Sequence, residues 1–275
     1  MNEALQIIHD RLMTIVKEQP PICGAWYFGS ASRAMSDEYS DLDVVFLVDS
    51  AGFEAVAARM TAWLEACCDR VVLCYPEGFN GEAIVNNGYL LELDGKMVVY
   101  DVFLLNSERL DDGICRMHYA ALRENSIIFD RDGRVRALIS DAAGTPWQDD
   151  AARLIDIYWY HAHLSAKYLL RGDFFKLEAV MRTLMDAHIS LLLTFCDRTT
   201  WGGSANKLHF LPADKQQHLK KYGCSDNFPL MRANLLQCFQ WFEADAKALM
   251  PAEATAAAEP VLAYWLEQTR SLNHA

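Results

Sequence analysis

The sequence lacks the features that would assign the chain to a membrane or to the secretory route. No apolar run approaches the roughly 18 residues that span a bilayer, and the eight cysteines show no CxxC spacing. The first residues, MNEALQIIHDRLMTIVKEQ, carry acidic side chains within an amphipathic pattern, which predicts a helix rather than a signal peptide. We therefore expect a cytoplasmic protein with free thiols and no membrane partner.

The sequence also has few basic residues and no long run of them. It contains 25 Lys and Arg residues against 37 Asp and Glu residues, which gives a formal net charge of −12, and its densest basic stretch is the short HLKKYG. Nucleic-acid binders usually carry a basic patch or stripe, so we expect no nucleic-acid partner. An acidic protein attracts cations, which favours a small, cationic ligand.

The first half of the sequence contains an alternation of helical and strand patterns. A helix is predicted over residues 3–18, and the later pattern gives two strands, a helix, a third strand, a loop, a hairpin around Asp94-Gly95, and then a strand, a turn and a helix. The two strands cover residues 23–28 and 42–48, the helix 51–68, the third strand 71–76 and the loop 77–88. The hairpin covers residues 89–105, and the last strand, turn and helix together cover residues 126–142.

From about residue 150 the pattern becomes purely helical. Residues 150–198 contain almost no Gly or Pro and predict two long helices around Arg171-Gly172-Asp173, and further helices follow. The sequence thus predicts an α/β (α+β) domain with a mixed sheet over residues 1–145. An all-helical bundle domain follows over residues 146–275.

One segment, YFGSASRAMSDEYSDLDVVFLVD, points to chemistry. Asp41 and Asp43 open an apolar strand, and the alternation of side chains along a strand places both on one face. Two carboxylates that point the same way repel each other unless a cation lies between them, and hard oxygen ligands suit Mg²⁺. Gly29 allows close backbone approach, and Ser30 can donate hydrogen bonds to a phosphate. These residues predict a site for a Mg²⁺-bound nucleoside triphosphate.

The same residues carry a family resemblance. Gly29-Ser30, a spacer, and then Ser40-Asp41-Leu42-Asp43 before an apolar strand resemble the GS…(S/T)DxD motif of the DNA polymerase β-type nucleotidyltransferase superfamily. The order of the two domains further resembles the aminoglycoside and lincosamide nucleotidyltransferases. This resemblance implies that residues 1–145 form a nucleotidyltransferase domain. It also implies an antibiotic-resistance enzyme that moves AMP from Mg-ATP, or a related nucleotide from another NTP, to a hydroxyl of a small acceptor and releases pyrophosphate.

The family needs a third carboxylate, and Asp101 is the best candidate. It is the one acidic residue in KMVVYDVFLL, where burial of an unpaired carboxylate would be costly. Glu92 is the rival. A two-residue turn at Asp94-Gly95 would pair Glu92 with Met97, which leaves Glu92 about four residues, or roughly 13 Å, from Asp101 along the strand.

The resemblance also implies roles for the three aspartates. Asp41 and Asp43 would hold two Mg²⁺ ions, while Asp101 would complete the second metal site and act as the general base for the acceptor hydroxyl. Some aminoglycoside enzymes with a similar layout use a glutamate as the base, so the identity of the base stays open here.

Three further residues are candidates for contact with the nucleotide. Arg33 follows the phosphate turn and could reach the triphosphate, Ser40 could bind phosphate or orient its loop, and Lys207 could bring a positive charge from the helical domain. Each of them could equally be an ordinary surface residue.

Two alternatives concern the acceptor and the function. Trp159, His163 and Lys167 follow one another at helical spacing, which is typical of a core stripe but could also line an acceptor pocket. The chain could also be a regulatory or toxin–antitoxin module that has the nucleotidyltransferase fold and acts on a protein or RNA. Pyrophosphate release with a small hydroxylated acceptor would distinguish the enzyme from such a module.

Overall fold

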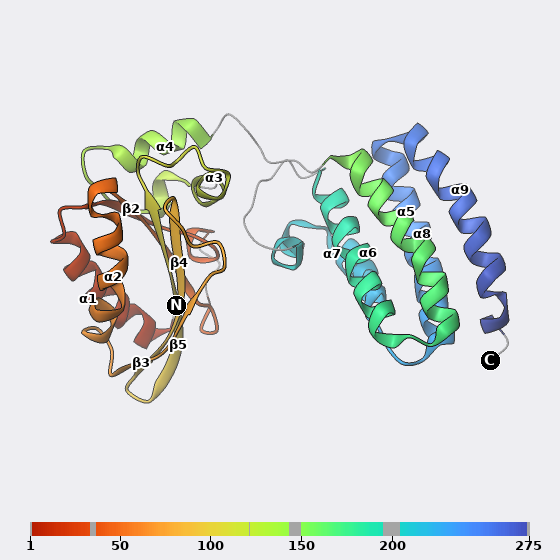
Figure 1. The fold of residues 1–275 in the computed structure, drawn as a ribbon, viewed down its shortest axis with the longest axis horizontal. Helices are drawn as coiled ribbons and strands as arrows, with labels where there is room; N and C mark the ends of the chain where they lie inside the picture. Colours follow the sequence, from red (N-terminus) through yellow and green to blue (C-terminus); the bar gives the residue numbers. More distant parts are fainter. Residues whose placement is uncertain (1, 34–36, 121, 143–149, 195–203, 274–275) are drawn as a thin grey trace. The chain divides into compact units, whose positions relative to one another are not determined.

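The computed structural model describes residues 2–33, 37–120, 122–142, 150–194 and 204–273. They form two compact units, one with the described residues up to 142 and one with those from 150 onward (Figure 1). The first contains a mixed sheet with helices and the second is helical, as predicted. The predicted boundary at residues 145/146 falls outside the described residues. In the described ranges, no helix combines the length and apolar character needed to cross a bilayer.

The sheet of the first unit is built from two antiparallel halves joined by one parallel pair. The strand order is β3-β4-β5-β2-β1-β6, and β2 pairs with β5 in parallel while the other neighbours are antiparallel. We call the β2–β5 pairing the parallel seam. The strands are β1 (Ile22–Tyr27), β2 (Leu42–Val48), β3 (Arg70–Pro76), β4 (Ile84–Leu93), β5 (Lys96–Asn106) and β6 (Ile127–Asp130).

Helices cover both faces of this sheet (Figure 1). Helix α1 (Glu3–Lys17), which begins where the Asn2 side chain accepts a hydrogen bond from the Ala4 N–H at 2.9 Å, packs with α2 (Phe53–Glu65) on one face. Helices α3 (Gly113–Tyr119) and α4 (Arg134–Ala142) pack on the other. Alternate residues of β2 serve the two cores, because Val44 and Phe46 face α1 and α2 while Val45 and Leu47 face α3 and α4.

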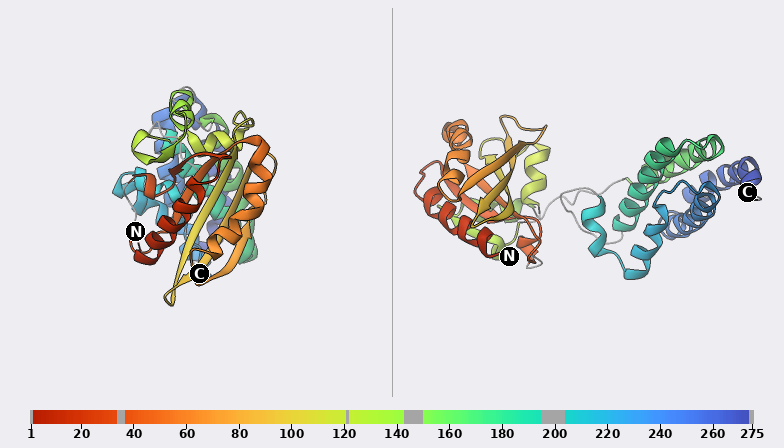
Figure 2. Two further views of the ribbon diagram at one scale, coloured as in Figure 1. Left: turned by 90° about the vertical axis from the view of Figure 1, so that its left-hand side faces the viewer. Right: turned by 90° about the horizontal axis from the view of Figure 1, so that it is seen from below.

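The second unit is a bundle of helices (Figures 1 and 2). α5 packs against α6, α8 and α9, and it ends at Gly172, whose φ of 60° allows the turn into α6. Inside the bundle the ring of Tyr158 stacks on that of Phe242 at a centroid distance of 3.4 Å. The helices are α5 (Ala151–Arg171), α6 (Phe174–Thr194), α7 (Ala213–Leu219), α8 (Phe228–Leu249) and α9 (Pro251–Gln268).

The structure corrects the prediction of a loop over residues 77–88, because β4 already begins at Ile84. Asn and Gly are typical turn residues, but the Asn86 side chain donates to the Val102 carbonyl at 3.2 Å and so ties β4 to β5. Gly88 lies directly opposite Asp101 in the ladder. The predicted pairing of Glu92 with Met97 is confirmed by the register, whereas α3 was not predicted.

A buried histidine ties the two strands that flank β2. His9 of α1 hydrogen-bonds through Nδ1 with the Tyr100 hydroxyl at 2.8 Å and through Nε2 with the Tyr27 hydroxyl at 2.9 Å. Tyr27 ends β1 and Tyr100 lies in β5. A neutral imidazole can donate from one nitrogen and accept at the other. Burial lowers the pKa of His9 to about 4, although Asp10 opposes this shift, so the ring is neutral at physiological pH.

We expect this histidine to make the first unit sensitive to acid. Because its folded pKa is depressed, its contribution to the free energy of unfolding is complete above pH 6.5 and declines by about 1.4 kcal/mol per pH unit from there toward pH 4. His9→Phe should remove that part of the pH dependence. It should also cost about 1–3 kcal/mol at pH 8, since two buried hydroxyls lose their partner.

Denaturant unfolding at pH 8 and pH 5 checks this expectation, with the exposed His163 of α5 changed to Phe as the control. Equal pH dependence in the wild type and His9→Phe would contradict it.

Candidate active site

The parallel seam places two carboxylates side by side. Asp43 of β2 pairs with Asp101 of β5 in register, so their side chains share the face on which Val45 and Phe103, two residues further along, are buried under α3 and α4. Both aspartates are half-buried, whereas Asp41 precedes β2 and is exposed. The geometry therefore brings together the second aspartate of the DxD motif and the predicted third carboxylate.

The described residues supply no basic partner for the charge of this site. Burial, then the charge of Asp41 and then that of Asp101 raise the pKa of Asp43 to about 7. Burial, Asp41 and Glu77 raise the pKa of Asp101 to about 6. Among the described residues, no Lys or Arg forms an ion pair with any of these four carboxylates. A cation would relieve their repulsion.

Two glycines show which way the carboxylates lean. Gly29 has a φ of +55°, and a Cβ atom there would collide with Asp43 Oδ2. A Cβ atom on Gly88 would lie 2.7 Å from Asp101 Oδ1, closer than a real side chain allows. Asp43 therefore leans toward the turn after β1, and Asp101 leans the opposite way, over β4.

The turn after β1 is held close to Asp43 by backbone hydrogen bonds. The Phe28 N–H donates to the Asp43 carbonyl at 3.0 Å, which extends the β1–β2 ladder to the residue before Gly29-Ser30. The Ser32 hydroxyl then donates to the Gly29 carbonyl at 2.8 Å and closes the turn. Successive backbone N–H groups in such a turn are typical of an anion site.

Ser40 has a local role in the structure. Its hydroxyl donates to Asp37 Oδ1 at 2.8 Å and accepts from the Asp37 N–H at 3.0 Å. These bonds order the loop directly before Asp41.

The other predicted residues have their own surroundings. Arg33 ends the short 3₁₀ helix Ala31–Arg33, and its side chain lies outside the described part. Lys207 is half-buried on the 3₁₀ helix Ser204–Phe210 of the second unit. Trp159 is buried in the helical core, which is the expected alternative to an acceptor pocket, and His163 stacks with Tyr264 at 4.8 Å.

Two acidic residues of the β3–β4–β5 half have different surroundings. Glu92, the rival third carboxylate, forms an ion pair with Arg70 at 2.6 Å and sits at the far end of β4. Glu77 was not predicted as part of the site. It follows β3, and its negative charge helps to raise the pKa of Asp101. No local pattern points to Glu77, because its place depends on the register of three strands.

The carboxylates fit a hard divalent cation by their chemistry. Asp41, Asp43 and Asp101 offer oxygen ligands of the kind that Mg²⁺ prefers. In the described ranges, no three His, Cys, Asp or Glu side chains converge on one point, and the opposite lean of Asp43 and Asp101 accounts for this.

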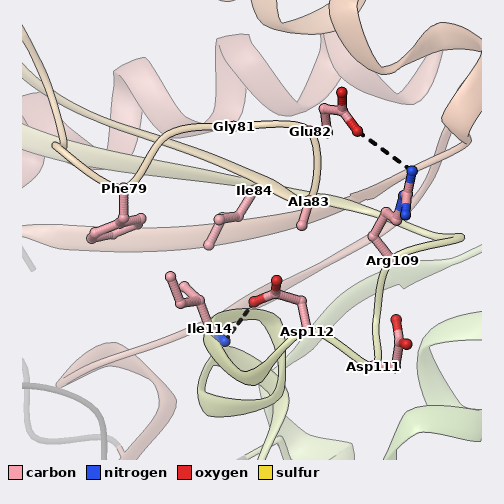
Figure 3. A pocket seen from close by; sticks show the side chains of 9 residues that line it. All are labelled: Phe79, Gly81, Glu82, Ala83, Ile84, Arg109, Asp111, Asp112 and Ile114. Carbon is pink, nitrogen blue, oxygen red and sulfur yellow. Dashed lines mark hydrogen bonds and ion pairs between the residues drawn. The ribbon is translucent and has the colours of Figure 1, made fainter.

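A separate hollow of about 380 Å³ lies near the end of β5 (Figure 3). Ile84 in its wall pairs with Leu105, about four residues or roughly 13 Å along the strand from Asp101. Three of its four charged groups have partners, since Glu82 pairs with Arg109 at 3.4 Å and Asp112 caps the Ile114 N–H at 2.8 Å. The hollow is lined by Phe79, Gly81, Glu82, Ala83, Ile84, Arg109, Asp111, Asp112 and Ile114.

Comparison with known proteins supports the resemblance seen in the sequence. The sequence profile of the streptomycin adenylyltransferase family matches residues 3–257, which confirms the similarity to antibiotic nucleotidyltransferases. No curated protein matches the chain. Among solved structures, an aminoglycoside 6-adenyltransferase from Bacillus subtilis is 15% identical, with 98% of this chain and 99% of that chain covered and a TM-score of 0.43. A nucleotidyltransferase-like protein from Exiguobacterium sibiricum is 10% identical, with coverages of 97% and 90% and a TM-score of 0.36.

The raised pKa of Asp43 predicts that this carboxylate destabilises the metal-free protein. A carboxyl whose folded pKa lies above its unfolded value of 3.8 costs stability above pH 7, and the cost fades as the pH falls toward 4. Asp43→Asn in EDTA at pH 8 should therefore raise the melting temperature of the first unit and increase its free energy of unfolding by about 1–4 kcal/mol. The gain should be smaller at pH 5.

Calorimetry at both pH values measures the effect, with the exposed Asp111→Asn as the matched control. A variant less stable than the wild type at pH 8 would show that the charge of Asp43 is compensated.

Proposed function

The chain belongs to the streptomycin adenylyltransferase family, and from this premise we propose that it transfers AMP from Mg-ATP to a hydroxyl group of an aminoglycoside antibiotic. The observation that carries the proposal is the in-register pair Asp43 and Asp101 beside the Gly29-Ser30 turn. A nucleotidyl transfer requires backbone N–H groups that bind phosphate and carboxylates that lie together on one face.

The nucleotide binds on the side of the turn. Backbone N–H groups near Gly29 and Ser30 hold the phosphates, and the lean of Asp43 toward Gly29 directs this carboxylate to the same place. Asp41, Asp43 and Asp101 would hold Mg²⁺, which when bound supplies positive charge to the triphosphate and to the developing pyrophosphate. Ser40 keeps the loop before Asp41 in place, and Arg33 and Lys207 stay predicted sources of positive charge for the phosphates.

The acceptor reacts on the side of Asp101. Its hydroxyl oxygen attacks the α-phosphorus, a new P–O bond forms, and the bond from the α-phosphorus to the bridging oxygen breaks so that pyrophosphate leaves with the electron pair. Asp101 takes the hydroxyl proton. A pKa of about 6 in the metal-free protein leaves this carboxylate largely ionised at neutral pH, and a base is most effective when its pKa lies near the working pH.

A turnover screen tests the proposed function. The full-length chain with ATP and Mg²⁺ is incubated with a panel of aminoglycosides and lincosamides, and pyrophosphate release and the mass of the product are followed. We expect an acceptor that gains the mass of AMP. Turnover with a protein or RNA substrate and with no member of the panel would overturn the proposal.

The role of Asp101 makes a sharper prediction. Asp101→Asn keeps the volume of the side chain but cannot accept the proton, so kcat should fall by roughly 10²–10⁴-fold while the Kd for ATP changes little. Glu92→Gln is the control, because Glu92 pairs with Arg70 away from the carboxylate pair. Steady-state kinetics on the best acceptor measures both. An active Asp101→Asn beside an inactive Glu92→Gln would place the base on Glu92.

A further inference from the structure

One row of directly opposed residues crosses four strands and ends at the carboxylate pair. Tyr75 of β3 pairs with Gly88 of β4, Gly88 with Asp101 of β5, and Asp101 with Asp43 of β2. Side chains that oppose one another in a sheet lie on the same face. Because Gly88 has no side chain, the carboxylate of Asp101 can lean over it toward β3, the strand that carries Tyr75. Two strand spacings, about 10 Å, separate their backbones.

This face is apolar and exposed next to the carboxylates. Tyr75 is 58% exposed, and the neighbouring row contains Leu73, 55% exposed, opposite Leu90, and Val99, 40% exposed. The intervening residues of β4 and β5 on the other face, such as Tyr89 and Tyr100, are buried under α1 and α2. Exposed apolar side chains that adjoin a charged site are typical of a ligand surface.

Glu77 adds a negative charge at the end of this row. Its N–H donates to the Asn86 carbonyl at 3.0 Å, which fixes its backbone beside β4, and its side chain is half-buried. In the described part of the chain it has no ion-pair partner. Glu77 follows Tyr75 by two residues, so the alternation of side chains along an extended chain places its carboxylate on the face that carries Asp101. A positively charged group between the two carboxylates would be attracted by both.

Resting on the proposed function, we propose that Tyr75, Gly88 and Glu77 form the subsite for a cationic sugar acceptor. A sugar ring lies with its apolar face against Tyr75, one positively charged group of the acceptor pairs with Glu77, and a hydroxyl of the same ring reaches the carboxylate of Asp101 over Gly88.

The opposite lean of the two aspartates fits this division of the site. Asp43 leans toward the Gly29 turn, where phosphates bind, and Asp101 leans over Gly88, where the acceptor lies. A side chain larger than hydrogen at Gly88 would occupy the acceptor's place and push Asp101 away. The net charge of −12 attracts a cationic acceptor to the protein as a whole. The carboxylate of Glu77 attracts it to this part of the surface.

Binding of streptomycin, a positively charged aminoglycoside, tests the subsite. Streptomycin is titrated calorimetrically into the full-length chain saturated with Mg²⁺ and α,β-methylene-ATP, which cannot transfer its AMP. Tyr75→Ala should weaken binding by about tenfold, while Tyr75→Phe, which keeps the ring, should bind nearly as the wild type does. Glu77→Gln should weaken binding by about tenfold in 50 mM salt, and the loss should be smaller in 0.5 M salt, where the charge is screened.

Two variants serve as matched controls. Phe175→Ala removes an aromatic ring that is 82% exposed on α6, and Glu82→Gln removes a carboxylate that pairs with Arg109. Neither should change streptomycin binding, and none of the variants should change the affinity for the nucleotide analogue.

The outcomes separate this inference from the proposed function. Unchanged streptomycin affinity in Tyr75→Ala and Glu77→Gln, or no streptomycin binding by the wild type, would overturn the subsite. The proposed function would stand in both cases if the wild type releases pyrophosphate with any aminoglycoside of the panel. Failure to bind the nucleotide analogue and to turn over any member of the panel would overturn the function itself.

Discussion

Backbone pairing at the parallel seam holds the carboxylates of Asp43 and Asp101 beside each other on a half-buried face. Paired strands lie roughly 5 Å apart, so the pairing brings two like charges close enough to repel each other. The fold imposes this repulsion, because register and not side-chain preference sets the spacing. Both neighbours of the pair are glycines, and each gives one carboxylate room to lean away from the other.

The surrounding structure keeps the pair in place despite that repulsion. Apolar residues of β2 and β5 on either side of the two aspartates are buried against helices on both faces of the sheet. From the α1 side, His9 joins the end of β1 to β5 across β2 through two tyrosines. The strands that carry Gly29, Asp43 and Asp101 therefore cannot separate without losing buried hydrogen bonds and apolar contacts. The stability of the core is what allows a destabilising cluster of charge to persist at its edge.

Local patterns in the sequence predicted the elements whose causes are local. The bounds of β2 were predicted at Leu42 and Val48 because a polar loop changes there to a continuous apolar run, and Asp94-Gly95 fixed the register of the β4–β5 hairpin. Asn86, Asn87 and Gly88 were misinterpreted as a loop, since the reasons for Asn86 and Gly88 lie across the sheet, at Val102 and Asp101. Glu77 was missed for the same kind of reason, and α3, only seven residues long, is too short for a clear helical period.

The topology of the seam also bears on how the site comes into being as the chain folds. The β1–β2 and β3–β4–β5 halves consist of strands that are neighbours in sequence, so each half can pair through short connections. The seam joins β2 to a strand that lies beyond α2 and the β3–β4 hairpin, and such non-local, parallel pairing is slow because loop-closure entropy must be paid first. On the ribosome, Asp41 and Asp43 would emerge long before Asp101. The Asp43–Asp101 pair therefore forms only after β5 has emerged and docked against β2, and a nascent chain ending before β5 carries the two aspartates of the DxD motif without the third carboxylate.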